Sequence, residues 1–165
     1  MRFSSSIFLF GLAATSLAAP VANAKRGVLT KQSYADFQVS DGVAGNALAE
    51  VNAKFPIDTS DLANVDPADQ QIISDARKVA ESAETDAFNP AIDAASGADA
   101  TALQNGKIKN KVLKLQLEVL DLQISQAQGE DNAAKIAEEQ TKLNNNIALD
   151  KKAAGQASQS VQFDG

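Results

Sequence analysis

The chain has 165 residues with a formal net charge of −6, and it contains no cysteine, histidine or tryptophan. The absence of cysteine excludes disulfides. The absence of both cysteine and histidine also excludes zinc or copper sites of the usual nitrogen and sulfur type, and nucleophilic sites with an imidazole base. Tyr34 is the one tyrosine, so the aromatic residues that line a sugar cleft are also missing, and we predict a protein that is not an enzyme and needs no cofactor.

The first 26 residues have the pattern of an export signal. Arg2 precedes an apolar run from Ile7 to Leu17, and small residues follow it, which is typical of a secretory signal peptide and too short for a membrane span. Cleavage after an alanine at 18, 19 or 24 satisfies the small-residue rule. The Lys25-Arg26 pair indicates a second cut that removes a short pro-segment. Residues 27–165 then form a single extracellular domain without a membrane span.

The first helix is predicted to follow a short N-terminal arm. Residues 31–39 are a mixed segment, either an extended arm or a first helical turn. Ser40 or Asp41 then caps a run of apolar residues at helical spacing, which begins at Val43 and stops at Pro56.

The glycine pattern at Gly42 and Gly45 is also typical of a phosphate-binding loop. No strand precedes it, however, and no lysine follows Gly45 in the P-loop position. We therefore expect Gly45 to lie inside the first helix and to pack closely against the helix predicted at residues 108–127.

The second helix has the clearest start. Asp66 is the expected cap, Pro67 takes the first helical position, and Asp69 adds negative charge where the helix dipole favours it. An alanine-rich apolar face follows. The Asn89-Pro90 pair restarts or kinks this helix, and the Ser96-Gly97 pair ends it.

The same region holds a group of acids that invites a calcium interpretation, with the candidate ligands Asp58, Ser60, Asp61, Asn64, Asp66 and Asp69. The EF-hand pattern fails here because Leu62 occupies its fifth position and the required glycine is missing. Capping and loop solubility explain these acids better, so we predict no metal site.

Residues 108–127 carry the most informative pattern. Apolar residues repeat at spacings of 4, 3, 4 and 3 along two neighbouring seams, one starting at Ile108 and one at Leu113. The stretch VLKLQLEVL also alternates like a strand, but about 20 residues of sustained pattern favour a helix. Two seams predict a central helix with neighbours on both sides.

A last helix is expected after Gly129, with a single seam through Ile136, Leu143 and Ile147 and a frayed tail in which Phe163 docks back. The elements together predict an all-α fold, an up-and-down bundle of four helices, or five if Asn89-Pro90 splits the second.

A lysine cluster is the one candidate interaction patch, formed by Lys107, Lys109, Lys111 and Lys114. Residues 27–99 carry a net charge of −9, and residues 100–165 are balanced, so the acidic front half excludes nucleic acid as a partner. The cluster could hold an anionic partner or the acidic half of a second copy. The alternative is a solvated helix face, since all but Lys109 lie along one side.

Two stretches resemble a group of small secreted proteins of filamentous ascomycete fungi, SYADFQVSDGVAGNALAEVNAKFP at residues 33–56 and LDLQISQAQGEDNAAKIAEEQTKLNNNIALDKKAAGQASQSVQF at residues 120–163. Members of that group are helical, cysteine-free and preceded by a signal peptide. The resemblance carries no catalytic motif, and it implies an extracellular fungal protein with a role at the cell wall or toward a host. The galactomannoproteins that adsorb to hydrophobic surfaces are similar in size and helical character, without a matching motif.

Two function hypotheses follow. The first is a secreted, non-enzymatic helical protein that acts through a protein or cell-surface partner, effector-like or associated with the cell wall. The second is an extracellular carrier or surface-adsorbing protein for lipid or another hydrophobic ligand, because alanine-rich helices can leave an apolar cavity in a bundle. Dense packing of most protein interiors favours the first.

Overall fold

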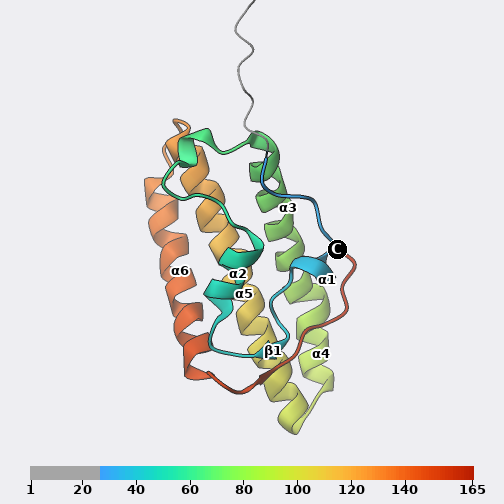
Figure 1. Cartoon of the computed structure of the whole chain (residues 1–165). Helices are drawn as coiled ribbons and strands as arrows, with labels where there is room; N and C mark the ends of the chain where they lie inside the picture. Colours follow the sequence, from blue (N-terminus) through green and yellow to red (C-terminus); the bar gives the residue numbers. More distant parts are fainter. Residues whose placement is uncertain (1–26) are drawn as a thin grey trace, which may run out of the picture.

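The computed structural model describes residues 27–165, which form an all-α helical bundle as predicted (Figure 1). The predicted signal peptide and the Lys25-Arg26 pair lie outside the described residues. The helices are α1 (Tyr34–Phe37), α2 (Ala47–Lys54), α3 (Pro67–Ala83), α4 (Asn89–Ala94), α5 (Gly97–Ala127) and α6 (Ala133–Lys152), with a short 3-10 turn at Leu62–Asn64. Two short strands, β1 (Gly42–Val43) and β2 (Ala157–Ser158), pair antiparallel. Among the helices of residues 27–165, none combines the length and the apolar character that a membrane span requires.

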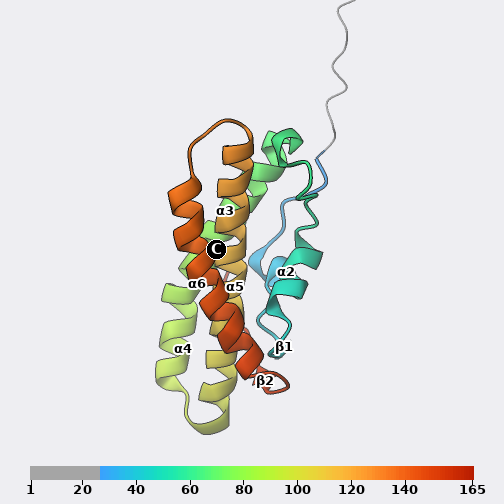
Figure 2. The same ribbon diagram turned by 90° about the vertical axis from the view of Figure 1, so that its left-hand side faces the viewer.

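Helix α5 is the centre of the bundle. It lies between α6 and the α3–α4 pair (Figure 1), and α2 packs on it from a third side (Figure 2). The two predicted seams are confirmed. One seam packs on α3 and the aromatic residues of the N-terminal arm, and the other packs on α2 and α6. The first contains Leu113, Leu117, Leu120 and Ile124, and the second contains Val112, Leu115 and Val119.

The beginning of α5 differs from the prediction. The helix starts at Gly97, not near residue 108, so the Ser96-Gly97 pair ends α4 and opens α5. Leu103 is the one buried apolar side chain of its first three turns, so these turns show little apolar periodicity. They are covered by the chain after α6, and Gln159 N–H donates to the Ala102 carbonyl at 3.0 Å. Contacts from the far end of the chain stabilise these turns.

The helical path from α3 to α4 is unbroken but changes its winding before Pro90. A π-helical segment, Glu84–Phe88, connects the two helices. Pro90 has no N–H, and its ring crowds the carbonyl of the residue four positions earlier, Asp86. A wider π turn accommodates both effects, so the Asn89-Pro90 pair alters the helix locally without ending it.

The start of α2 differs from the prediction in its first residue, in its cap and in the position of Gly45. The helix begins at Ala47 rather than Val43, and neither Ser40 nor Asp41 caps it. Gly45 lies before the helix with a φ of +117°, a conformation that side chains other than glycine rarely adopt. A Cβ at this position would come within 2.8 Å of the Ala154 Cβ, so Gly45 approaches the end of α6 and not α5.

The cap of α2 comes from a distant helix. Asp150, near the C-terminal end of α6, is 2% exposed. Its Oδ1 accepts a hydrogen bond from Gly45 N–H at 2.8 Å, and its Oδ2 accepts one from Ala47 N–H at 2.9 Å. A carboxylate at this place satisfies N–H groups that the first turn leaves free, and it complements the helix dipole.

Candidate interaction surface

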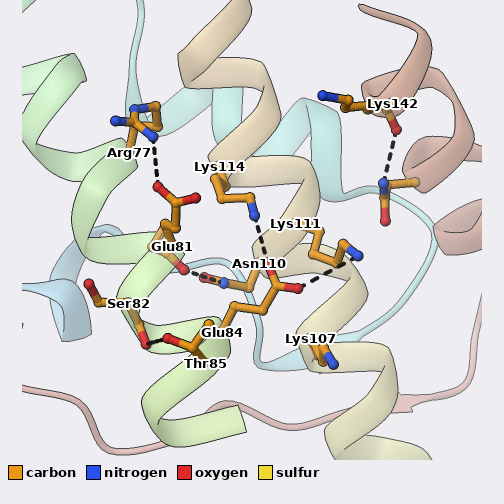
Figure 3. A network of polar contacts seen from close by, with 12 residues as sticks. Arg77, Glu81, Ser82, Glu84, Thr85, Lys107, Asn110, Lys111, Lys114 and Lys142 are labelled. Atoms are coloured by element: carbon orange, nitrogen blue, oxygen red, sulfur yellow. Dashed lines mark hydrogen bonds and ion pairs between the residues drawn. The ribbon is translucent and has the colours of Figure 1, made fainter. Parts of the chain in front are cut away.

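The four lysines of the predicted patch do not share one surface. Lys107, Lys111 and Lys114 lie on the side of α5 that faces the π-helical segment (Figure 3). Lys109 is two residues after Lys107, and at 3.6 residues per turn it lies about 200° around the helix. The structure therefore separates Lys109 from the other three, which we call the lysine face.

The lysine face is organised around one carboxylate, that of Glu84. Lys114 Nζ is 2.8 Å from Glu84 Oε2, and Lys111 Nζ is 3.6 Å from Oε1 (Figure 3). Burial acts to raise the pKa of Glu84, but the hydrogen bond from Lys114 and the charges of the three lysines together lower it. Lys107 Nζ donates to Asn89 Oδ1, a neutral acceptor, at 2.6 Å. Two ammonium groups therefore pair with the Glu84 carboxylate, and the charge of a third, Lys107, also acts on it.

The neighbouring turns of the bundle are electrically balanced by comparison. Arg77 Nε is 2.8 Å from Glu118 Oε2, and Arg77 Nη1 is 2.8 Å from Glu81 Oε2. Lys135 Nζ of α6 approaches Glu118 Oε1 at 3.2 Å. Here two cations meet two carboxylates, so this cluster carries no excess positive charge, unlike the lysine face.

Lys109 has a structural position instead. Its side chain is fully buried, and Nζ is 2.9 Å from Glu50 Oε2 of α2. Nζ also donates to the carbonyl oxygens of Asp41 at 3.0 Å and Val43 at 3.1 Å. The ammonium therefore fastens the turn before α2 to α5. Including Lys109 in the interaction patch was wrong, because an enclosed ammonium with three acceptors is not available to a partner.

A second buried polar group joins the N-terminal arm to the core. Tyr34 Oη donates to Asn110 Oδ1 at 2.8 Å, and Asn110 Nδ2 donates to the Ala80 carbonyl at 2.8 Å. Burial raises the pKa of Tyr34 to about 12, which outweighs the lowering effect of a nearby serine hydroxyl. This pair was not predicted from the sequence. The sequence signal for this pair was Asn110 itself, an asparagine that directly follows Lys109 within the apolar pattern of α5.

The chain after α6 is ordered against the bundle rather than frayed. It pairs with β1, crosses α5 and ends near α1 (Figure 1). Ser160 N–H donates to Asp41 Oδ1 at 2.8 Å, and the Phe163 ring meets the Tyr34 ring edge to face with centroids 5.7 Å apart. The tail therefore fixes the same arm that Tyr34 anchors, and Phe163 docks as expected.

Acids that were considered as calcium ligands accept hydrogen bonds from backbone N–H groups instead. Asp66 caps α3 as predicted, with its Oδ1 accepting from Ala68 N–H at 2.8 Å. Asp58 Oδ1 accepts from the N–H and hydroxyl of Ser60. Asp69 is buried and also accepts from backbone N–H groups. Within residues 27–165, no group of three or more acidic side chains is placed to hold a metal ion.

Comparison with known proteins gives a family and no assigned activity. Neither a curated protein nor a solved structure matches the chain. Residues 29–162 match the family described as Domain of unknown function (DUF8454), and this range includes every helix from α1 to α6. The chain therefore belongs to the DUF8454 family.

Proposed function

We propose that the protein is exported and acts without catalysis, by binding a protein or cell-surface partner that carries anionic groups. The lysine face is the proposed contact surface. The observation that carries this proposal is its charge: Lys111 and Lys114 share the carboxylate of Glu84, and Lys107 binds a neutral amide beside them. Positive charge of this kind, in a protein that is acidic overall, orients an anionic partner toward one face.

Export is supported by the sequence of residues 1–26, which has the pattern of a signal peptide. The resemblance to small secreted proteins of filamentous ascomycete fungi points in the same direction. Together they support a fungal protein that acts at the cell wall or toward a host. A wall or host surface that presents anionic groups would be complementary to a lysine cluster.

The packing of the core favours this proposal over a carrier of hydrophobic ligands. Both seams of α5 pack against side chains from neighbouring elements. A pocket beside Phe37 and Phe55 has a volume of about 50 Å³, whereas ligand pockets usually have roughly 300–1,000 Å³. A larger hollow of about 570 Å³ is open to solvent and lined partly by charged residues, Lys31, Asp75, Lys78 and Asp164.

The experiment compares two triple variants with the same loss of charge. The first, K107Q/K111Q/K114Q, neutralises the lysine face, and the second, K142Q/K151Q/K152Q, neutralises three lysines on α6. Each purified protein is incubated with isolated cell walls of the producing organism at low and high salt, and the sedimented fraction is measured. We expect the wild type and the α6 variant to sediment at low salt, and the first variant to remain in solution. Equal sedimentation of both variants would remove the lysine face from the proposal.

A further inference from the structure

Asp69 is a buried carboxylate that lacks a cation among the residues the structure describes. Its side chain lies on the first turn of α3, and the residue is 3% exposed. Its Oδ2 accepts from Val28 N–H at 2.8 Å, and its Oδ1 accepts from Leu29 N–H at 2.9 Å. A carboxylate has about four acceptor sites, so two remain. A buried charge with hydrogen bonds but no opposite charge remains costly to bury.

Gly27 lies directly against this carboxylate. A Cβ on Gly27 would come within 2.7 Å of Asp69 Oδ1 and 3.2 Å of its Cγ, so a side chain at this position would collide with Asp69. The backbone nitrogen of a residue is about 2.5 Å from its own Cβ position, which follows from standard bond lengths. The Gly27 nitrogen is therefore at most about 5 Å from Asp69 Oδ1. The wide range of backbone angles open to glycine allows the rotation that a hydrogen bond to Asp69 would need.

We propose that cleavage after Arg26 creates an α-ammonium group at Gly27, and that this group forms an ion pair with Asp69. A dibasic-specific endoprotease of the secretory route adds water across the Arg26–Gly27 peptide bond. Arg26 leaves with the new carboxylate, and Gly27 keeps the amine. The amine takes up a proton, because an α-amino group has an ordinary pKa of about 7.7–8.0.

Before cleavage, the same nitrogen is an amide with one N–H and no charge. Cleavage therefore adds a positive charge and further donors beside a carboxylate that has free acceptor sites. The processed protein becomes more stable than its precursor, and the arm that contains Leu29, which packs on the core, is fastened to α3.

The ion pair also distinguishes cleavage after Arg26 from signal cleavage after an alanine alone. Cleavage after Ala24 places the ammonium on Lys25, two residues before Gly27, whereas cleavage after Arg26 places it on Gly27 itself. The inference uses the export that the proposed function assumes, but it is independent of the lysine face. Failure of the wall-binding experiment would therefore leave it untouched.

The test measures the melting temperature of the same protein before and after cleavage. The full chain is produced with its own leader in a secretory host that lacks the dibasic-specific protease, purified from the medium, and then cleaved with that protease. We expect the melting temperature to rise by about 4 °C on cleavage, a shift typical of one newly paired buried charge in a domain of this size.

Two variants serve as controls. In Asp69→Asn the carboxylate is gone, so cleavage should change the melting temperature by less than about 1 °C. An alanine inserted between Arg26 and Gly27 keeps the new charge but moves it one residue away, and the gain should be lost there too. An equal rise in all three proteins, no rise in the wild type, or a native mature terminus other than Gly27 would overturn the inference.

Discussion

The Nζ atom of Lys109 lies 2.9 Å from Glu50 Oε2, and this ion pair joins the central helix α5 to α2. The lysine end is fully enclosed, while the glutamate end is 38% exposed. The same ammonium also binds the carbonyls of Asp41 and Val43. Lys109 therefore holds both α2 and the segment that precedes it against α5. Burying a lysine is tolerated here because each of its three donors has an acceptor.

Replacing Lys109 by methionine should therefore be strongly destabilising. The change keeps the apolar stem but leaves two carbonyl oxygens and Glu50 without their donor, so we expect a loss of about 3 kcal/mol in the free energy of unfolding. Urea denaturation measures this loss. Lys152→Met, at an exposed lysine of α6, is the control and should change the free energy by less than about 0.5 kcal/mol. Equal effects of the two changes would contradict the assigned role of Lys109.

Gly106 marks the point where the C-terminal segment crosses α5. A Cβ on Gly106 would overlap the carbonyl oxygen of Gln159. In an exposed helix, Gly→Ala stabilises by about 1 kcal/mol, so the sign of the effect is diagnostic. We expect Gly106→Ala to lower the melting temperature and to expose residues 157–165 to proteolysis. A rise in the melting temperature would contradict this, because it would show that residues 157–165 can move away from α5 without loss of stability.

Asp150 should contribute to stability through the first turn of α2. Asp150→Ala leaves the N–H groups of Gly45 and Ala47 without an acceptor, and we expect a loss of about 2 kcal/mol in urea denaturation. Asp131→Ala, on an exposed residue in the connection before α6, serves as a control and should have little effect. Hydrogen exchange should quicken within residues 47–54 of the Asp150 variant. Unchanged exchange there would refute the capping role.

Stability should fall at high pH through Tyr34. Burial raises the pKa of its phenol to about 12 in the folded protein, against an ordinary value of about 10 in the unfolded chain. The folded state thus holds its proton over a range in which the unfolded state releases it. The resulting contribution of about 2–3 kcal/mol is complete below pH 10 and is lost as pH rises from about 10 to 12.

Because Tyr34 is the one tyrosine, ultraviolet absorbance of tyrosinate follows this titration without interference. Tyr34→Phe is the control variant. It should cost about 1 kcal/mol at neutral pH, because Asn110 Oδ1 loses its donor, and it should remove this part of the pH dependence. A tyrosinate midpoint near pH 10 in the folded protein would show that Tyr34 is not enclosed as described.

The sequence was sufficient for features that depend on local pattern. The two seams of α5 and the Asp66-Pro67 start of α3 follow from spacing and capping rules that act within a few residues. The first turns of α5 could not be predicted from these rules. They bury little apolar surface of their own and depend on contact with the chain after α6, where Gln159 crosses them. No local rule connects residues so far apart in the chain.

The wrong predictions for the cap of α2 and for Lys109 also arose because local patterns do not show tertiary contacts. Asp150 caps α2 from a position 103 residues beyond Ala47, a relationship that only tertiary structure reveals. Lys109 was grouped with its neighbours by type, although its position on the helix aligns it with the buried Val112 and Leu113. A lysine at such a position is a candidate for a buried ion pair rather than a surface contact.

We propose that the protein is exported, has a closed core, and binds partners at its surface without carrying a ligand inside. Native mass spectrometry of the protein from culture supernatant tests this claim most directly. We expect the mass of residues 27–165 with no bound small molecule. Co-purifying lipid in stoichiometric amount, or recovery of the chain from cells alone, would contradict it.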